Sequence, residues 1–470
     1  MLKRVLVANR GEIAVRIIRE CLDCSIEAVA VYSTADEYSL HAAIATDSVC
    51  IGGPRPQDSY LNMNNIIEAA KATGCDAIHP GFGFLSENSV FAKRCEESGI
   101  RFIGPSSGVI KLMGDKASAR ELMKKAGVPV TPGSEGTVND EDEAAEVAAR
   151  IGYPVMIKAS AGGGGRGMRK AQDEQELRRM FAEASCEAES CFGDGSIYIE
   201  KLISDPRHIE IQIIGDSFGN IVQLGDRDCS IQRRNQKMLE EAPAWGLDER
   251  LRTEMAEAAV KAAAAAGYES AGTVEFIVDK DENFYFIEMN TRIQVEHPVT
   301  EAVSGINIIR EQLRIASGMS LSFGQEDVEI LGHAIECRIT AEKIFDDFAP
   351  CPGTVSFLHL PAGEGVRVDS ALYSGCEISP YYDSMVAKVI VRGDSRLAAI
   401  RKMRRALGET VIEGVETTLP IQYLLMYDSD FIRGKYDTGF MDLHLGKLLS
   451  LYEEAGNLIV SHICQVHIFH

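Results

Sequence analysis

The chain has 470 residues, which at roughly 150 residues per domain predicts about three domains and more than one hydrophobic core. Apolar residues make up 45% of the chain and charged residues 25%, which excludes collagen-like, disordered and low-complexity proteins. The 48 basic and 70 acidic side chains leave a net charge of −22. Sequence-independent binding of nucleic acid is therefore disfavoured, and an anionic substrate would need cations gathered at one place.

The cysteines and the N-terminus indicate a reducing, intracellular setting. The twelve cysteines are scattered, and the one pair at redox or metal spacing, Cys21 and Cys24, ends a helical pattern without a second Cys or His pair. Structural thiols are the favoured interpretation. The sequence contains no signal-peptide pattern and no apolar run of the ~18 residues that a membrane span requires. We therefore expect a cytoplasmic protein with no membrane partner.

Strand and helix patterns alternate over residues 1–113, which predicts a first domain of βαβ units with a parallel sheet. The predicted strands are 5–8, 28–32, 76–79 and 100–103, and the predicted helices are 12–24 and 64–72. Ligands of open parallel sheets lie at the carboxyl ends of strands, here residues 8–12 and 79–87. The G-x-G-x-x-G of dinucleotide-binding domains is absent after the first strand, which argues against a dehydrogenase.

The rest of the chain is predicted to form a second domain over 114–330, a third over 331–447, and a tail over 448–470 of unknown role. The predicted elements are helix 116–126 with Asp115 as its cap, hairpin 209–224, helix 248–266, strands 333–339, 353–360 and 386–391, and helix 397–407. The apolar residues 457–470 are expected to follow the final helix.

A glycine-rich loop is the strongest local signal of function. A β-rich run delivers Lys158, residues 162–167 include five glycines, and a second strand pattern follows. Glycine lets backbone N–H groups approach an anion closely, and lysine supplies a positive charge for phosphate. The loop differs from a P-loop because G-K-[ST] and a following helix are missing. A phosphate-covering loop is favoured over a merely flexible hairpin loop.

A second hairpin, residues 272–290, carries paired carboxylates. If residues 280–283 form a four-residue loop, Glu275 lies opposite Glu288, and Asn290 follows on the same face. The other face then holds Val274, Phe276, Val278, Tyr285, Ile287 and Met289. Facing carboxylates destabilise a half-buried sheet unless a cation lies between them. Carboxylate and amide oxygens suit Mg²⁺, so a metal site is favoured over an exposed pair or a shared proton.

Two polar segments flank this hairpin in the sequence. If the extended pattern continues, Asn290, Arg292, Gln294 and Glu296 share the metal's face and could bind a small anion and remove its proton, although a solvated strand edge is the alternative. The basic run 226–237 indicates either anion binding or a salt-bridged face. His79, His208 and His297 are by default interpreted as structural histidines, because no zinc spacing is present.

Eight strings in order carry a family resemblance: ANRGEIAVRI, HPGFGFLSEN, LMGDK, IKASAGGGGRGM, RDCSIQRRNQK, FIEMNTRIQVEHPVTE, GHAIECRI and PYYDSM. Over residues 1–447 the chain resembles the biotin carboxylase component of biotin-dependent carboxylases, in the ATP-grasp superfamily. The resemblance implies an α/β fold with an N-terminal parallel-sheet domain, an ATP-grasp domain whose lid spans about 131–203, and a C-terminal domain that completes the site.

The resemblance also implies a reaction. ATP and bicarbonate would give carboxyphosphate and ADP, and CO₂ would then be captured by N1′ of biotin. Mg²⁺ or Mn²⁺ would assist as cofactor, with two ions expected. Such a loose phosphoryl transfer depends on positioning and charge neutralisation more than on covalent catalysis.

Residue roles follow by motif position. ATP would contact Lys116, Lys158, Gly164, Gly165, Glu200, Lys201, Leu202, Ile203, His208, Gln232, Asn235, Glu275, Ile277 and Glu288, and the metal would be held by Glu275, Glu288 and Asn290. Bicarbonate would contact Lys237, Arg292, Gln294, Val295 and Glu296, with Glu296 as the general base. Biotin would contact Phe82 and Arg338, and Arg338 would stabilise its ureido oxygen.

Three departures from the family pattern stand out. Asn235 occupies a position where many relatives have histidine, Phe82 one often held by tyrosine, and residues 341–347 differ from the commoner Ala-Glu-Asp-Pro run. None removes a proposed metal ligand or base, so activity is expected.

The resemblance implies partners as well. No Met-Lys-Met biotinylation sequence is present, so biotin is expected on a separate carrier protein, with carboxyltransferase subunits as further partners and a homodimer as the assembly. Acetyl-CoA carboxylase and fatty acid synthesis are the favoured context. The alternatives are a detached biotin carboxylase subunit of a pyruvate or propionyl-CoA carboxylase and, from another class, a non-catalytic ATP-binding regulatory protein.

Overall fold

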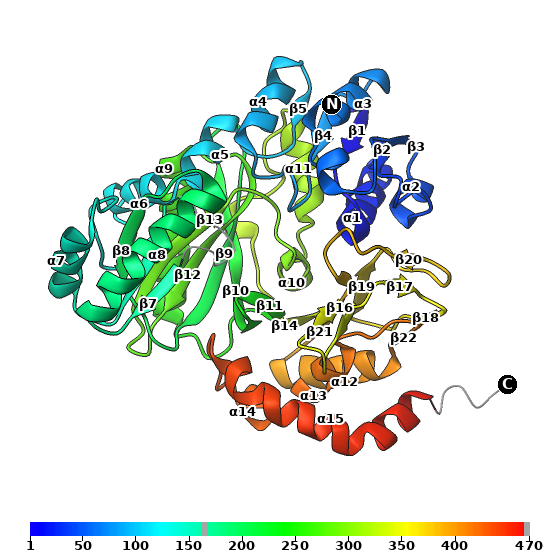
Figure 1. Ribbon diagram of the computed structural model, residues 1–470. Helices are drawn as coiled ribbons and strands as arrows, with labels where there is room; N and C mark the ends of the chain where they lie inside the picture. The colour runs from blue at the N-terminus through cyan, green and yellow to red at the C-terminus, as the bar shows by residue number, and fades with distance from the viewer. Residues whose placement is uncertain (161–167, 465–470) are drawn as a thin grey trace.

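The computed structural model describes residues 1–160 and 168–464, without the side chains of Phe192 and of residues 455–464. Its N-terminal part is a five-stranded parallel sheet in the order β3-β2-β1-β4-β5, flanked by helices (Figure 1). The strands are β1 (Arg4–Val7), β2 (Glu27–Tyr32), β3 (Asp47–Cys50), β4 (Ala77–His79) and β5 (Arg101–Phe102). The helices are α1 (Gly11–Asp23), α2 (Leu40–Ile44), α3 (Met63–Ala72), α4 (Ser89–Glu97) and α5 (Ser107–Gly114). The predicted βαβ architecture is confirmed.

The loops after β1 and β4 meet at the carboxyl edge of this sheet. The Asn9 side-chain amide donates to the carbonyl oxygens of Pro80 and Phe82, each at 2.7 Å. Asn9 is buried, so these bonds fix the two loops to each other. The N-terminal part therefore presents residues 10–12 and 82–87 on a rigid edge.

An eight-stranded antiparallel sheet forms the centre of the molecule, in the order β13-β12-β9-β10-β11-β14-β21-β19. Its strands are β9 (Arg207–Gly215), β10 (Ile221–Arg233), β11 (Gln236–Ala242), β12 (Ser270–Val278), β13 (Phe284–Asn290), β14 (His333–Thr340), β19 (Val366–Ser370) and β21 (Met385–Gly393). The pairing of β11 with β14 continues the sheet across residue 330, where the sequence predicts a domain boundary. The last three strands in this order thus belong to the predicted third domain.

Helices cover the sheet, and aspartate side chains cap the N-termini of two of them. The helices α6 (Lys116–Lys125) and α9 (Glu249–Ala266) begin at Asp115 and Asp248, whose side chains accept from backbone N–H groups of the first turn. In α9 the predicted core residues Met255, Ala259, Ala262 and Ala263 are buried. The short helices α10 (His297–Ser304) and α11 (Ile308–Ala316) follow β13, and α12 (Arg396–Glu409) packs against β21.

A small separate sheet, β7-β6-β8, carries the predicted phosphate lysine. Its strands are β6 (Val155–Ala159), β7 (Met168–Ala171) and β8 (Ile197–Lys201), covered by α7 (Glu141–Ile151) and α8 (Glu174–Phe192). In Figure 1 this unit lies at the left, away from the N-terminal sheet. Lys158 faces Met168 across the antiparallel β6–β7 pair, so the strand predicted after the glycine-rich segment is confirmed. Gly164 and Gly165 themselves lie outside the described residues.

The β12–β13 hairpin differs from the prediction in its loop. Glu275 does face Glu288, but the loop comprises the five residues 279–283, and Ile287 is an extra, unpaired residue between Glu288 and Phe286. This bulge changes the phase of β13, because one added residue moves the following side chains to the opposite face. Phe284 and Phe286 are consequently buried in the core, whereas the predicted core residues Tyr285 and Ile287 are only partly buried.

Three further expectations are corrected. Residues 353–360 form two short strands rather than one, β17 (Gly353–Thr354) and β18 (Phe357–His359), which pair with β20 (Glu377–Ile378) and β22 (Val411–Glu413). β13 ends at Asn290, so residues 291–296 are a loop rather than an extended strand.

The third correction concerns the final helix, α15 (Phe440–Cys464). It continues past residue 457, where the sequence predicts that the helix has already ended, and it runs along the lower edge of Figure 1. Leu448 of α15 is 1% exposed in the C-terminal core, so the predicted tail begins inside a packed helix.

The remaining elements are short. They are β15 (Glu342–Lys343), β16 (Ala349–Pro350), α13 (Leu419–Leu425), α14 (Ser429–Ile432) and two 3₁₀ turns, Pro56–Asp58 and Gln325–Asp327. Among the residues that the structure describes, none of the helices combines the length and the apolar character that crossing a membrane would require.

Candidate active site

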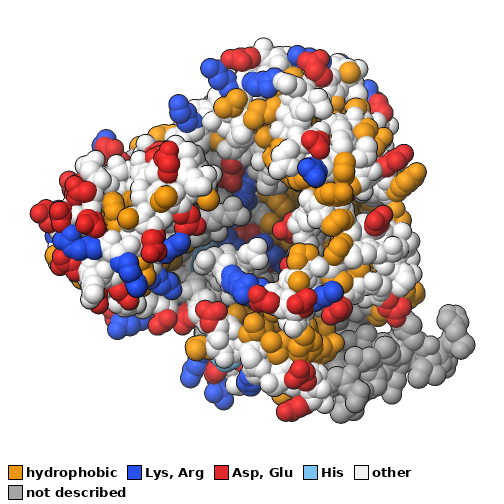
Figure 2. Space-filling view, viewed as in Figure 1, with side chains coloured by type: hydrophobic (Ala, Val, Ile, Leu, Met, Phe, Trp, Pro, Cys, Tyr) orange, Lys and Arg blue, Asp and Glu red, His pale blue; other side chains and the backbone are white. Residues whose placement is uncertain are grey.

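A large cavity of about 1480 Å³ opens between the N-terminal sheet, the small sheet and the central sheet. Figure 2 shows it as the hollow near the middle of the molecule, with acidic and basic side chains at its walls. The described residues predicted to bind ATP, metal, bicarbonate or biotin all line it, namely Phe82, Lys116, Lys158, Glu200, Lys201, Leu202, Ile203, His208, Gln232, Asn235, Lys237, Glu275, Ile277, Glu288, Asn290, Arg292, Gln294, Val295, Glu296 and Arg338.

The paired carboxylates of the β12–β13 hairpin, which we call the carboxylate hairpin (Glu275 and Glu288), form one wall. Glu275 is buried, and its Oε1 accepts from the Lys237 ammonium at 2.9 Å and from the Asn290 amide at 2.8 Å. Its Oε2 lies 2.9 Å from His208 Nε2. Burial by itself would raise the pKa of Glu275, but Lys237 and His208 outweigh it and hold the pKa well below its usual value. Glu275 is therefore ionised.

Two lysines line the same cavity from outside the central sheet. Lys116, at the start of α6, places Nζ 3.3 Å from Glu288 Oε2. Lys158, on β6, contacts the carboxylate of Glu200, which also accepts from Arg120 at 3.0 Å. Burial by itself would lower the pKa of Lys158, but Glu200 raises it above the usual value, so its ammonium stays charged. Each of these two cations thus lies beside a carboxylate at the cavity.

The residues predicted to hold adenine and ribose lie together along the cavity, but two side chains are already committed to the fold. The ammonium of Lys201 donates to the carbonyl oxygens of Gly152 and Tyr153, at 2.9 and 2.8 Å. The Gln232 amide donates to the carbonyl oxygen of Cys229 at 3.1 Å. Leu202, Ile203 and Ile277 supply apolar lining.

Asn235 sits in a two-residue turn between β10 and β11. Arg234 and Asn235 have φ of 50° and 62°, the left-handed conformation that a tight hairpin turn requires at both positions. Asparagine adopts this conformation more easily than most residues. The departure from histidine at this position is thus compatible with the backbone. Arg233 and Arg234 of the basic run form ion pairs with Asp347, as a salt-bridged face would. Lys237 of the same run lies inside the cavity, where anion binding stays a prediction.

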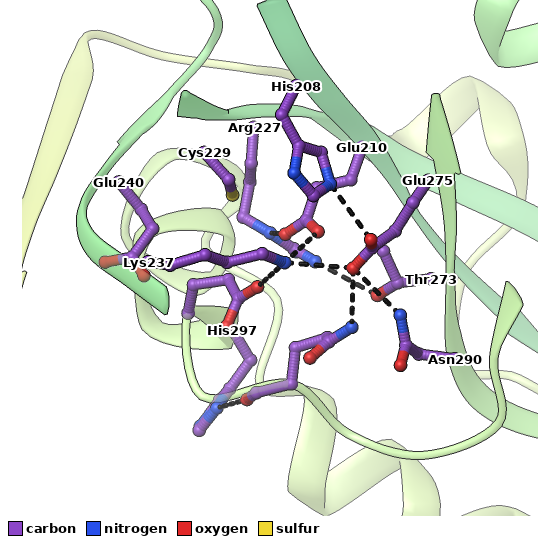
Figure 3. A network of polar contacts seen from close by, with 12 residues as sticks. His208, Glu210, Arg227, Cys229, Lys237, Glu240, Thr273, Glu275, Asn290 and His297 are labelled. Carbon is purple, nitrogen blue, oxygen red and sulfur yellow. Dashed lines mark hydrogen bonds and ion pairs between the residues drawn. The ribbon is translucent and has the colours of Figure 1, made fainter. Parts of the chain in front are cut away.

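A second group of charges, which we call the convergent cluster (Glu210, Lys237, Arg292, Glu296 and Arg338), forms the adjacent wall. Lys237 Nζ donates to Glu210 at 2.8 Å, to Glu275 at 2.9 Å and to Glu296 at 2.7 Å, as the dashed lines of Figure 3 show. Burial by itself would lower the pKa of Lys237, but the three carboxylates raise it well above the usual value. This ammonium joins the carboxylate hairpin to the convergent cluster.

Glu296 lies at the centre of the convergent cluster, directly before α10, and is 1% exposed. One carboxylate oxygen accepts from Lys237, and the other accepts from Arg338 at 3.0 Å. Burial would raise the pKa of Glu296, as would Glu210, but Lys237 and Arg338 outweigh both and lower it. Glu296 is therefore an ionised carboxylate held between two cations.

Arg292 is held by the loop around it. Its guanidinium donates to Glu87 at 2.8 Å, to Gln294 Oε1 at 2.7 Å and to Asn290 Oδ1 at 3.1 Å. The loop 290–296 thus gathers its polar side chains at one face although it is not a strand. Phe82 lines the cavity from the N-terminal part, in the loop that Asn9 fixes.

Sequence reasoning missed several charged neighbours. Arg227 is completely buried and donates to Glu210 at 2.7 Å, and Glu210 has its pKa lowered to about 2 because Lys237 and Arg227 outweigh the effect of burial. Glu240 accepts from Arg338, and Glu87 holds Arg292. Glu210 had a detectable signal, because it alternates with Ile209, Ile211 and Ile213 along β9. Glu87 lies in the segment 79–87 where the sequence predicts a ligand-binding edge, whereas Glu240 had no such signal, since its partner Arg338 is distant in sequence.

Comparisons with known proteins agree with this geometry. Three family models match the chain, biotin carboxylase N-terminal domain over residues 1–110, carbamoyl-phosphate synthase L chain ATP-binding domain over 115–323, and biotin carboxylase C-terminal domain over 336–443. Biotin carboxylase 1 of Bacillus subtilis is 55% identical over 445 residues, which cover 94% of this chain and 99% of that protein. The chain belongs to the biotin carboxylase family. It is an ATP-dependent ligase of the ATP-grasp type.

Two other relatives broaden this picture. A pyruvate carboxylase subunit of Methanothermobacter thermautotrophicus is 52% identical over 442 residues, 94% of this chain and 90% of that protein. The biotin carboxylase domain of Hydrogenobacter thermophilus 2-oxoglutarate carboxylase, solved as a dimer with MgADP, ADP and bicarbonate, has a TM-score of 0.92 at 50% identity and covers 95% of this chain and 99% of that one. Members of the biotin carboxylase family thus occur in carboxylases with different acceptors.

The donor set of the carboxylate hairpin fits a magnesium ion. Glu275 and Glu288 are carboxylates on paired strands at one face, and the amide oxygen of Asn290 lies on the same wall. Hard oxygen ligands of this kind suit Mg²⁺, which takes one or two carboxylates together with phosphate oxygens. In the structure Lys237 contacts Glu275 and Lys116 contacts Glu288, so both carboxylates already attract positively charged groups.

Proposed function

We propose that the enzyme carboxylates N1′ of biotin with ATP and bicarbonate, through carboxyphosphate, and that the biotin arrives on a separate carrier protein. The observation that carries this proposal is the placement of Lys237, Arg292 and Arg338 around the buried Glu296, in the same cavity as Lys116, Lys158 and the carboxylate hairpin. Although the chain carries a net charge of −22, these cations lie together in the cavity where ATP and bicarbonate would meet.

Lys116 and Lys158 would bind the phosphates of ATP, with Gly164 and Gly165 covering them. Both ammonium groups face carboxylates in the structure, and phosphate oxygens would replace those contacts on binding. Glu275, Glu288 and Asn290 would hold Mg²⁺, which would supply positive charge to neutralise the negative charge that develops during phosphoryl transfer. The apolar residues Leu202, Ile203 and Ile277 would receive the adenine, beside His208, Gln232 and the backbone of residues 200–201.

Glu296 would act as the general base on bicarbonate. Its carboxylate is ionised and lies between Lys237 and Arg338, while Arg292, Gln294 and the Val295 N–H would position the anion. When bicarbonate takes over contacts of Lys237, Glu296 loses part of the charge that lowers its pKa and becomes a stronger base. The deprotonated anion can then attack the γ-phosphate. Arg338 would next stabilise negative charge on the ureido oxygen of biotin, and Phe82 would contact the biotin.

The enzyme is expected to function with partners. We infer a homodimer from the dimeric Hydrogenobacter domain, together with a biotin carrier protein and carboxyltransferase subunits in the cytoplasm. Acetyl-CoA carboxylase and fatty acid synthesis are the proposed context, supported by the relative from Bacillus subtilis. The relative from Methanothermobacter thermautotrophicus favours pyruvate as a second candidate acceptor. Identification of the carboxyltransferase that co-purifies with the enzyme distinguishes the two.

The test is an assay of ATP cleavage by purified enzyme with Mg²⁺. We expect ATP cleavage that requires bicarbonate and increases when free biotin is added. ATP turnover that is indifferent to both bicarbonate and biotin contradicts the proposal, and ATP binding without any turnover favours a non-catalytic ATP-binding protein. Product analysis should find carboxybiotin in amounts equal to the biotin-dependent release of ADP.

A further inference from the structure

One buried ammonium lies beside the convergent cluster and has no role in the contacts described so far. Lys388 is on β21, and its side chain is 0% exposed. Its partner directly across on β14 is Arg338, the guanidinium that contacts Glu296. Two cations at opposite positions destabilise a sheet unless each has its own counter-charge. The position of Lys388 therefore calls for a specific reason.

The contacts of Lys388 come from three distant parts of the chain. Nζ donates to the carbonyl oxygen of Val295 at 2.8 Å and lies 3.0 Å from Glu12 Oε1, in the first turn of α1. Asp369, its strand partner on β19, is farther away at 3.9 Å. The Nζ atom is also 6.0 Å from the centre of the Phe82 ring. Lys388 thus links the N-terminal edge, the loop before α10 and the central sheet.

The partners of Lys388 differ in what they provide: Glu12 provides a negative charge, and the Val295 carbonyl accepts a hydrogen bond. A buried ammonium costs several kcal/mol unless a counter-ion compensates it, and Glu12, which is 5% exposed, supplies that charge. The bond to Val295 has a different consequence. Residues 291–296 are in neither a strand nor a helix, so no regular ladder fixes their backbone. A charged donor on the Val295 carbonyl fixes the peptide that joins Val295 to Glu296.

We propose that Lys388 is a positioning residue for bicarbonate, holding the Val295 backbone so that the Val295 N–H and the Glu296 carboxylate face the anion together. The proposal rests on the proposed function, in which these two groups bind and deprotonate bicarbonate. Lys388 itself does not line the cavity, whereas Val295, whose carbonyl oxygen it contacts, does. Its effect should therefore fall on bicarbonate rather than on ATP.

The experiment compares three variants by steady-state kinetics with free biotin. Lys388→Met removes the donor, and the double variant Glu12→Gln with Lys388→Met also removes the carboxylate that would otherwise stay buried without its cation. Lys402→Met is the matched control, since Lys402 also donates to two backbone carbonyls, of Glu364 and Arg392, but on the exposed surface outside the cavity. The KM for bicarbonate, the KM for ATP and the melting temperature are measured for each.

We expect the KM for bicarbonate to rise about tenfold or more in both Lys388 variants, because a hydrogen bond from a charged donor is lost. The KM for ATP should stay within about twofold, and the double variant should melt closer to the parent than the single variant does. Lys402→Met should change neither constant. If the single variant fails to fold, the double variant decides; if both fail, Glu12→Gln alone should raise the bicarbonate KM by a smaller factor.

Two results overturn the proposal. One is a folded variant whose bicarbonate KM equals that of the parent, and the other is a parallel rise in both KM values, which indicates a general structural role. A parent enzyme whose ATP cleavage ignores bicarbonate would instead contradict the proposed function, so the two failures are distinct.

Discussion

The carboxylate hairpin and the convergent cluster share one cavity but are built in different ways. Glu275 and Glu288 come from adjacent strands joined by a five-residue loop, so their pairing is local in the chain. The convergent cluster takes Glu210 from β9, Lys237 from β11, Glu296 from the loop before α10 and Arg338 from β14. Its contacts span 59 residues for Lys237 with Glu296, 98 for Arg338 with Glu240 and 205 for Arg292 with Glu87.

This difference teaches how the enzyme handles buried charge. The carboxylate hairpin concentrates negative charge, which the lysines of neighbouring elements compensate in the structure and which the proposed metal would compensate further. The convergent cluster alternates signs within itself, so each buried ion has partners in the folded chain alone. The hairpin should therefore respond to metal, whereas the convergent cluster should determine proton transfer and stability.

The largest expected effect is on turnover, from Glu296→Ala. Loss of the general base should lower bicarbonate-dependent ATP cleavage about 10²- to 10⁴-fold. Because Lys116, Lys158 and the carboxylate hairpin are untouched, MgATP affinity should stay near that of the parent, as equilibrium binding can measure. Turnover like that of the parent would refute the assignment of the base and remove the contrast between the two regions.

The next effect is on stability, from Lys237→Met. The variant leaves Glu210, Glu275 and Glu296 without the ammonium that they share, and breaking a buried ion pair in this way costs roughly 3–5 kcal/mol. Urea unfolding measures the loss. Lys124→Met, which breaks the exposed pair with Glu135, is the control and should cost about 1 kcal/mol or less. Equal losses of unfolding free energy in both variants would show that Lys237 contributes no more to stability than an exposed lysine does.

A smaller effect should appear in metal dependence, from Glu275→Gln and Glu288→Gln. Changing a group behind a metal ligand already costs about 10- to 100-fold in affinity, so loss of a ligand charge should raise the Mg²⁺ concentration needed for activity by at least about tenfold. Titration of Mg²⁺ at fixed ATP tests this. The variants of the hairpin should differ here from Arg292→Lys, whose Mg²⁺ requirement should match that of the parent.

The smallest effect concerns pH and involves Glu240, which accepts a hydrogen bond from Arg338 of the convergent cluster. Burial raises the pKa of Glu240 from 4.5 to about 7, although Arg338 opposes the shift. Because the folded state then binds this proton more tightly than the unfolded state, the stability that Glu240 contributes is present below pH 4.5 and is lost as the pH rises through about 7. Glu240→Gln should lack this loss in urea unfolding between these pH values. Identical pH profiles would contradict the raised pKa.

Local periodicity let the sequence predict a large part of the fold. The parallel N-terminal sheet, the capped helices α6 and α9, and the opposition of Glu275 and Glu288 all follow from patterns within about thirty residues. The bulge at Ile287 escaped prediction because the loop and the bulge together leave the pairing of Glu275 with Glu288 as predicted. Only the packing of Phe284 and Phe286 reveals the change of phase.

By itself the sequence determined the charge balance, the glycine-rich loop after Lys158, and the carboxylate pair, because residue type and a period of two are local properties. The tertiary structure alone decided that the central sheet continues through β14 and β21, that Glu240 joins the site, and that Lys388 reaches Val295. Those contacts depend on which distant strands pair. Strand pairing over such separations is set by the burial of a whole sheet face, which no short stretch of sequence contains.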